Sequence, residues 1–270
     1  MRTFAVRFSL KFIHLIITFT TDFGTRDYYA ATLKGAMLCE AENLIFIDIT
    51  HHIKPYDIVA AAYALRHAYR SFPQGTVHVI AVDNHYQQQT EYVIAQHEGH
   101  YFVAPDNGVL TLIFDGLPSD AAYRLPFPSA PSAFPLKDVF AKAIGYLFKN
   151  QALTDIGAPA HDLMQRITLQ PVVTNTFIRC SVIHIDNYEN VVINLSKKSF
   201  EQAVQERSFE LYFKRNYPIT KLSETYHDVA IGETLCLFNA AGLLEIAVNM
   251  GRAASLLSLN LDDTIQIIFE

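Results

Sequence analysis

Tryptophan is absent from this 270-residue chain, and cysteine is scarce. The three cysteines, Cys39, Cys180 and Cys236, lie far apart and form no CxxC pair, so a disulfide framework is excluded and a reducing compartment is favoured. Only 18% of the residues are charged and 50% are hydrophobic, which excludes a disordered chain. No uninterrupted apolar run approaches the roughly 18 residues that a membrane-spanning helix needs.

The sequence also lacks an excess of basic residues. Its formal net charge is −6 and its isoelectric point is near 6.0, which argues against non-specific binding to nucleic-acid phosphates. Arg7, Lys11 and His14 interrupt the apolar N-terminal stretch, which therefore differs from a secretory signal peptide. We expect a cytoplasmic protein with neither a nucleic acid nor a membrane as partner.

Strands and helices are expected to alternate in the first part of the chain. Apolar segments at 15–20, 44–49 and 76–82 are typical of buried strands. Between the last two, apolar residues recur every three or four positions over 58–72, which predicts an amphipathic helix. The alternation predicts an α/β domain with a mainly parallel sheet over residues 13–165.

The pattern changes in the last hundred or so residues. Short β-rich runs dominate there, with one short helix among them. Runs of this kind are typical of a small antiparallel barrel or sandwich. We therefore predict that a smaller, all-β, barrel-like domain follows over residues 172–270.

Three aspartates lie at the ends of the predicted parallel strands: Asp22, Asp48 and Asp83. Ligands of open parallel sheets bind beyond the carboxyl ends of the strands. A carboxylate in such a place can accept hydrogen bonds from ribose hydroxyls or orient a water molecule. Each aspartate can equally cap a helix or lie in a solvated loop, so the pattern indicates a site without identifying it.

Other motifs give weaker signals. His97 and His100 are expected to flank a hairpin instead of converging on a metal ion, and no metal site is predicted. The chain contains neither G-x-G-x-x-G nor G-x-x-x-x-G-K-[ST]. The Asp-Asn-Gly segment at 106–108 is interpreted as a tight turn with a left-handed glycine. Asp186 and Asn190 are either ligand groups or parts of a solvated turn.

Six blocks of residues occur in a characteristic order. They are TTDFG at 20–24, with DY at 27–28 and KG at 34–35; IDITH and IKPYDI within 47–58; FPQGTVH at 72–78, leading to VD at 82–83; APDNGVLT at 104–111; IDNYEN at 185–190; and NAAGLLEIAVNMGRAA at 239–254. In this order the blocks resemble the S-adenosylmethionine hydroxide adenosyltransferases. These enzymes are relatives of the halogenating enzymes, fluorinating and chlorinating, that act on S-adenosylmethionine.

The resemblance implies the two-domain fold of that family, S-adenosylmethionine as the substrate, and no cofactor. In the family, water attacks C5′ and releases adenosine and L-methionine. The substrate lies between the first domain of one subunit and the second domain of its neighbour in a homotrimer. The implied substrate-binding residues are Asp22 for the ribose hydroxyls, Tyr56 beside the sugar, Asp186 for the methionine amino group, and Asn190, Tyr226 and the backbone near Gly251 around the adenine.

The residues that position the water depart from the family pattern. The family uses an Asp, an Arg and a His; the Asp corresponds to Asp83, but Thr90 stands at the arginine position and Pro135 at the histidine position. Leu136 stands where the halogenating relatives hold halide with a small hydroxyl residue, which argues against halogenation.

Two nearby residues are candidates to replace the missing groups. His85 can supply the lost imidazole and Lys137 the lost cation; alternatively, His85 is an exposed loop residue and Lys137 a solvated residue near a helix start. Hydrolysis of S-adenosylmethionine, with Asp83, His85 and Lys137 as catalytic residues, is therefore one interpretation. The alternative is a protein that binds S-adenosylmethionine or adenosine with little or no catalysis.

Overall fold

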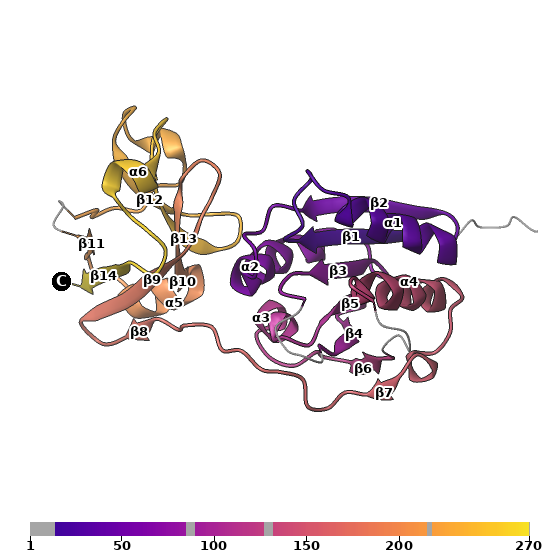
Figure 1. The fold of residues 1–270 in the computed structure, drawn as a ribbon. Helices are drawn as coiled ribbons and strands as arrows, with labels where there is room; N and C mark the ends of the chain where they lie inside the picture. Colours follow the sequence, from indigo (N-terminus) through magenta and orange to yellow (C-terminus); the bar gives the residue numbers. More distant parts are fainter. Residues whose placement is uncertain (1–13, 85–89, 127–131, 215–217, 270) are drawn as a thin grey trace, which may run out of the picture. The chain divides into compact units, whose positions relative to one another are not determined.

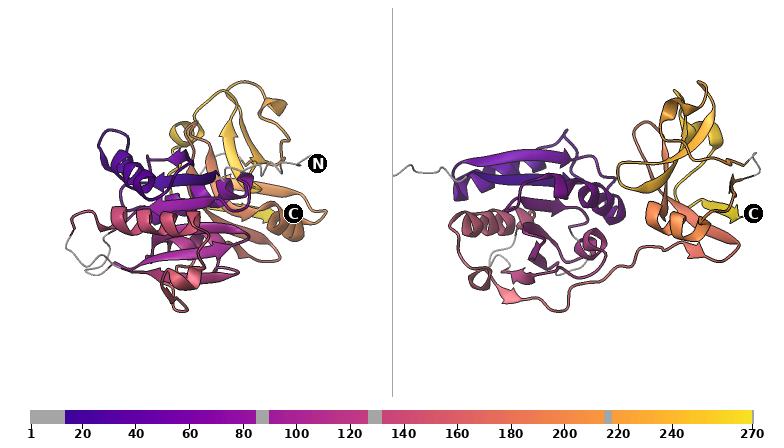
Figure 2. Two further views of the ribbon diagram at one scale, coloured as in Figure 1. Left: turned by 90° about the vertical axis from the view of Figure 1, so that its right-hand side faces the viewer. Right: turned by 180° about the vertical axis from the view of Figure 1, so that it is seen from behind.

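The structure, a computed structural model, describes residues 14–84, 90–126, 132–214 and 218–269. The chain forms two compact units, Met1–Ile167 and Thr168–Glu270, which are drawn from three directions in Figures 1 and 2. Each unit encloses its own hydrophobic core. Among the described residues, no helix is both long enough and apolar enough to cross a membrane.

The first unit is built around one seven-stranded sheet in the order β2-β1-β3-β5-β4-β6-β7. Its elements are β1 (Leu15–Thr21), α1 (Tyr29–Glu40), β2 (Leu44–Thr50), α2 (Ile58–Ala68), η1 (Tyr69–Ser71), β3 (Val77–Ala81), β4 (Tyr92–His97), β5 (His100–Pro105), α3 (Val109–Phe114), β6 (Ala121–Leu125), α4 (Pro135–Phe148), η2 (Leu153–Asp155) and β7 (Ala158–Pro159). Helices α1 and α4 pack together over one core, and α2 and α3 over another. The sheet is therefore the middle of three layers.

This sheet is mixed, which corrects the prediction of a mainly parallel one. β1 pairs in parallel with β2 and β3, and β3 with β5, whereas β4, β6 and β7 join by antiparallel pairing. The hairpin expected between His97 and His100 is confirmed and makes β4 antiparallel to β5, because Glu98 and Gly99, with φ of 49° and 77°, form its two-residue turn. Such a turn makes the next strand antiparallel, since a parallel neighbour needs a long crossover.

The amphipathic pattern over 58–72 is confirmed as α2 followed by the short helix η1. Asp57 caps α2, with its carboxylate accepting the amide of Ala60 at 2.9 Å. Leu65 and Tyr69 are buried against the sheet, and burial of apolar side chains of this size stabilises the fold by about 1.5–3 kcal/mol each. This packing holds the segment after β2 against the carboxyl ends of the strands.

The second unit contains one antiparallel sheet in the order β11-β14-β9-β10-β13-β12, with β8 paired to β9. Its elements are β8 (Val172–Val173), β9 (Phe177–Ile185), β10 (Val191–Ser196), α5 (Lys197–Val204), β11 (Phe209–Phe213), η3 (Tyr226–Asp228), β12 (Thr234–Phe238), β13 (Leu243–Val248), α6 (Ala253–Leu257) and β14 (Thr264–Phe269). The sheet curls into a half-barrel around its core. Bridges at Leu211–Ile219 and Leu222–Cys236 connect its edge strands through the segment between β11 and η3.

Candidate active site

The turn after β1 places Asp22 where three segments of the first unit meet. The amide of Asp22 donates to the carbonyl of Ala81, at the end of β3, at 3.3 Å. Its Oδ2 accepts the amide of Tyr56, after β2, at 3.1 Å and the amide of Asp83, after β3, at 3.2 Å. The structure thus brings together three of the predicted site residues, Asp22, Tyr56 and Asp83.

Both donated amides belong to residues with a left-handed backbone. Tyr56 has φ of 71° and Asp83 has φ of 51°, a conformation that costs a non-glycine residue free energy and is frequent at functional sites. It directs two N–H groups at one carboxylate oxygen of Asp22. No described residue forms a hydrogen bond with the other oxygen, Oδ1, so this oxygen can accept one from a ligand.

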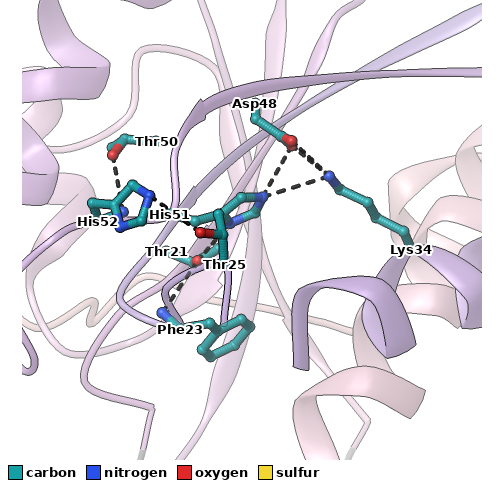
Figure 3. A network of polar contacts seen from close by, with 8 residues as sticks. All are labelled: Thr21, Phe23, Thr25, Lys34, Asp48, Thr50, His51 and His52. Carbon is teal, nitrogen blue, oxygen red and sulfur yellow. Dashed lines mark hydrogen bonds and ion pairs between the residues drawn. The ribbon is translucent and has the colours of Figure 1, made fainter. Parts of the chain in front are cut away.

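The third strand-end aspartate, Asp48, is engaged elsewhere. Its carboxylate accepts hydrogen bonds from Lys34 Nζ at 2.6 and 2.8 Å and lies 3.1 Å from Nε2 of His51. On the other side of the imidazole ring, Nδ1 lies 2.8 Å from Oγ1 of Thr21. Figure 3 shows the resulting chain of polar contacts, which runs from α1 through the end of β2 to the turn after β1.

The surroundings of Asp48 and His51 set the protonation states of these two side chains. Partial burial acts to raise the pKa of Asp48, but hydrogen bonds and charges from Lys34 and His51 outweigh it and lower the pKa. Burial lowers the pKa of His51, although Asp48 opposes this. A neutral His51 therefore donates Nε2–H to Asp48 and accepts the Thr21 hydroxyl at Nδ1. Sequence reasoning missed this role, because residues on three elements show no common spacing.

The Asp-Asn-Gly segment does more than form the predicted turn. Gly108 has the expected left-handed backbone, with φ of 94°. Asn107 is only 1% exposed, and its Nδ2 donates to the carbonyls of Val82 at 3.0 Å and Asp83 at 3.2 Å. Sequence reasoning missed this contact because a local turn explains an Asn-Gly pair without any long-range partner.

An aromatic cluster joins the Asp22 turn to the start of α4. The ring of Phe134, which precedes α4, lies 5.7 Å from that of Phe23 and 5.4 Å from that of Tyr29, measured between centroids. Edge-to-face contacts of this kind stabilise a pair of rings by about 0.5–1.5 kcal/mol beyond their burial. The first turn of α4, which contains Lys137, is therefore held near the site.

The candidate replacements for the missing water-positioning groups stay predictions. His85 lies outside the described residues. Lys137 Nζ pairs with Asp138 at 3.0 Å, and within the described ranges no hydrogen bond or ion pair joins it to Asp83. Asn84, directly after Asp83, is 8% exposed, and its Oδ1 has no donor among the described residues. A buried acceptor of this kind is costly unless a water or a ligand satisfies it.

In the second unit, Asp186 and Asn190 are in direct contact between β9 and β10. Oδ1 of Asp186 accepts the amides of Tyr188 and Asn190, both at 2.8 Å, and Oδ2 accepts Nδ2 of Asn190 at 3.1 Å. The loop is thus folded around the carboxylate of Asp186. This arrangement brings two predicted site residues together, and it fixes the orientation of the Asn190 amide.

Tyr226 contacts a buried glutamate that sequence reasoning missed. Glu245, on β13 and 3% exposed, accepts a hydrogen bond from the Tyr226 hydroxyl at 2.8 Å and one from Nδ2 of Asn239 at 3.1 Å. Burial raises the pKa of Glu245, and the charge of Asp186 raises it further, against the lowering effect of both hydrogen bonds. The available signal was an acidic residue inside the apolar run that forms β13.

Gly251 lies in the turn after β13, where its amide donates to the carbonyl of Val248 at 2.9 Å. A Cβ at this position would lie 2.6 Å from Cγ1 of Val248, so the turn requires glycine. Its role beside the adenine stays a prediction. Across the described residues, no group of three or more His, Cys, Asp or Glu side chains is arranged to hold a metal ion.

Comparisons with known proteins agree over most of the chain. The SAM hydroxide adenosyltransferase N-terminal domain matches residues 17–157, and the C-terminal domain of the same family matches residues 180–266. An (R)-S-adenosyl-L-methionine hydrolase of Methanocaldococcus jannaschii is 30% identical, covering 94% of this chain and 96% of that protein. A fluorinase of Actinoplanes sp. is 24% identical, covering 87% and 91%.

The same likeness extends to three dimensions. The crystal structure of an uncharacterized conserved protein from Thermotoga maritima superposes with a TM-score of 0.84 at 28% identity, covering 93% of this chain and 99% of that chain. Matches to both domains of one family, in chain order, span most of the sequence. On this evidence the chain belongs to the SAM hydroxide adenosyltransferase family.

Proposed function

We propose that this protein hydrolyses S-adenosylmethionine to adenosine and L-methionine. Family membership and the names of the hydrolase relatives support the reaction type. The observation that carries the proposal is the carboxylate of Asp22, which two backbone amides fix through Oδ2 while no described residue bonds Oδ1. A carboxylate oxygen held in this way is suited to accept hydrogen bonds from ribose hydroxyls.

The reaction needs little beyond orientation of its reactants. A water oxygen attacks C5′ in line with the C–S bond, so that a C5′–O bond forms as the C5′–S bond breaks. The electron pair goes to sulfur, and methionine leaves as a neutral thioether that needs no general acid. The surplus proton of the water passes to solvent by way of the Asp83 carboxylate, which orients the water.

The remaining residues take the roles implied by the family. Tyr56, whose side chain is mostly exposed, packs beside the sugar. Asp186 binds the methionine amino group, and Asn190, Tyr226 and the backbone at Gly251 surround the adenine. The proposal includes no cofactor, a homotrimer in which neighbouring subunits share each site, and a cytoplasmic location.

The test is incubation with S-adenosylmethionine and measurement of adenosine and methionine by mass spectrometry. Because the hydrolase relatives are named for the (R) sulfonium epimer, the (R) and (S) epimers are assayed separately. Asp83→Asn keeps the size of the side chain and removes its charge. Asp155→Asn, at an exposed carboxylate of η2 in the same unit, is the matched control.

Equimolar adenosine and methionine that depend on Asp83 but not on Asp155 would support hydrolysis. Binding of S-adenosylmethionine or adenosine in a calorimeter without any product would favour the alternative, a non-catalytic binding protein. Neither product nor binding would refute the proposal.

The contribution of the two replacement residues is tested separately. We expect His85→Ala or Lys137→Met to lower turnover by about tenfold or more if the imidazole or the cation acts on the water. Turnover equal to that of the wild type in both variants would exclude them as catalytic residues. Lys142→Met, on the same helix as Lys137, controls for the loss of a cation from α4.

A further inference from the structure

Asp83 adopts its left-handed backbone between two partners that hold its two peptide groups. On one side, its amide donates to Oδ2 of Asp22 at 3.2 Å. On the other side, its carbonyl accepts Nδ2 of Asn107 at 3.2 Å, and the same Nδ2 donates to the carbonyl of Val82 at 3.0 Å. A strained backbone at a functional residue persists only where several surrounding contacts hold it. These hydrogen bonds hold the backbone of Asp83 in this way.

The orientation of the Asn107 side chain is itself fixed. Its Oδ1 accepts the amide of Val109, at the start of α3, at 3.1 Å, so both ends of the amide are used. If the side-chain amide of Asn107 were turned by 180°, its oxygen would face the carbonyls of Val82 and Asp83 and its NH₂ group would face the N–H of Val109, so all of these hydrogen bonds would be lost. The side chain is also 1% exposed, so water does not compete for these bonds.

The contact with Val82 and Asp83 is separate from the local turn. The bond from Val109 to Oδ1 spans two residues and suffices to form an Asn-Gly turn. The bonds from Nδ2 instead reach residues 24 and 25 positions earlier. They join the start of α3 to the segment after β3, where the candidate catalytic carboxylate lies.

We propose that Asn107 is a positioning residue for the reaction: it holds the backbone of Asp83 so that its carboxylate faces the water and its amide fixes Asp22. The role rests on the proposed hydrolysis of S-adenosylmethionine. Asn107 is buried and acts through the two carbonyls that it binds. Misplacement of a reacting group by about 1 Å can lower a rate by about 10²-fold, so the loss of this contact affects turnover.

The test variant is Asn107→Asp, which keeps the shape of the side chain and its acceptor for Val109 but removes both donors. We expect its turnover number to fall by about tenfold to a hundredfold, whereas KM rises by a smaller factor, because the amide of Tyr56 still holds Oδ2 of Asp22. The matched control is Thr111→Val, which removes a buried hydroxyl that donates to the carbonyls of Gly108 and Met164. The Thr111→Val variant loses hydrogen bonds in the same segment as Asn107, so we expect its stability to fall and its turnover number to stay unchanged.

Hydrogen exchange gives a readout that does not depend on catalysis. The Asp83 amide is protected by its bond to Asp22, and we expect Asn107→Asp, but not Thr111→Val, to exchange this amide at least tenfold faster. Unchanged exchange together with unchanged turnover in Asn107→Asp would overturn the inference. Absence of product from the wild type would refute the proposed function instead, and the exchange rates would then decide alone whether Asn107 holds Asp83.

Discussion

Nδ1 of His51 lies 2.8 Å from the hydroxyl oxygen of Thr21, and this contact links the end of β2 to the turn that carries Asp22. Backbone bonds reinforce the link, because the amide of Gly24 donates to the His51 carbonyl at 2.7 Å and that of Ile53 to the Thr21 carbonyl at 3.3 Å. The imidazole thus connects the Lys34–Asp48 ion pair to a turn of the candidate active site.

We expect His51→Leu to destabilise the protein by about 1–3 kcal/mol, because it leaves the proton of the buried Thr21 hydroxyl without the acceptor at Nδ1. The turn that holds Asp22 also loses a support, so the affinity for adenosine falls. Denaturant unfolding and calorimetry measure the two effects. His51→Asn, which presents an acceptor near the position of Nδ1, is the control and is expected to keep more of both. A His51→Leu variant with wild-type stability and affinity would contradict the role assigned to the imidazole.

Glu245→Gln tests the buried contacts around Tyr226. The substitution removes a buried charge, yet we expect it to lower stability by about 1–3 kcal/mol, because the glutamine has only one oxygen to accept the two hydrogen bonds, from Asn239 Nδ2 and the Tyr226 hydroxyl, that the carboxylate accepts. Asn239 cannot turn to offer its own oxygen to the new NH₂ group, since its Oδ1 already accepts the amides of Ala241 and Leu243. Thermal unfolding measures the loss.

The double variant Glu245→Gln with Asn239→Asp restores a donor facing an acceptor. It is expected to recover part of the stability lost in Glu245→Gln alone, and with it the position of the Tyr226 ring. Equal stability of the single variant and the wild type would show that the second hydrogen bond to the Glu245 carboxylate contributes nothing measurable.

The first unit is expected to lose stability in mild acid because of His78. Its Nδ1 lies 2.7 Å from the Thr18 hydroxyl and its Nε2 lies 3.2 Å from Nδ1 of His100. Burial, with a smaller effect from His100, lowers the pKa of His78 from 6.5 to about 3. Below about pH 6.5 the unfolded chain therefore binds a proton that the folded chain does not, so the free energy of unfolding falls from pH 6.5 towards pH 3.

Denaturant unfolding followed by circular dichroism across this pH range measures the effect. His78→Gln is expected to be less stable near neutral pH but to show a shallower loss in acid. His161→Gln, at an exposed position of the same unit, controls for removal of a histidine and should match the wild-type slope. An unchanged slope in His78→Gln would assign the acid sensitivity to other groups.

The second unit is expected to fold as a separate fragment of residues 168–270. It has its own core, centred on buried side chains of β9, β10, β13 and β14, and all pairings between its strands are internal. A cooperative thermal transition of the fragment, with Glu245→Gln lowering its midpoint as in the full chain, would confirm this. A fragment without a cooperative transition would show that the unit depends on the rest of the protein.

Much of the architecture follows from local patterns. The apolar runs at β1, β2 and β3 and the helical repeat of α2 each bury one continuous surface, so residue type and spacing determine them. The β-rich unit Thr168–Glu270 likewise folds around an antiparallel sheet. The hairpin expected between His97 and His100 makes β4 antiparallel to β5, whereas the places of β6 and β7 could not be read from local residues, because they pair with strands distant in the chain.

For the site, the sequence alone determined which residues are candidates, because aspartates at strand ends and an ordered set of motifs are visible in one dimension. Only the tertiary structure decided among them. Asp22 and Asp83 converge through a backbone amide, whereas Asp48 is held by Lys34 and His51. Asn107 contacts Val82 and Asp83, 25 and 24 residues earlier, and Glu245 contacts Tyr226, 19 residues earlier. Residue spacing does not predict such contacts, because each depends on where the whole fold places both residues.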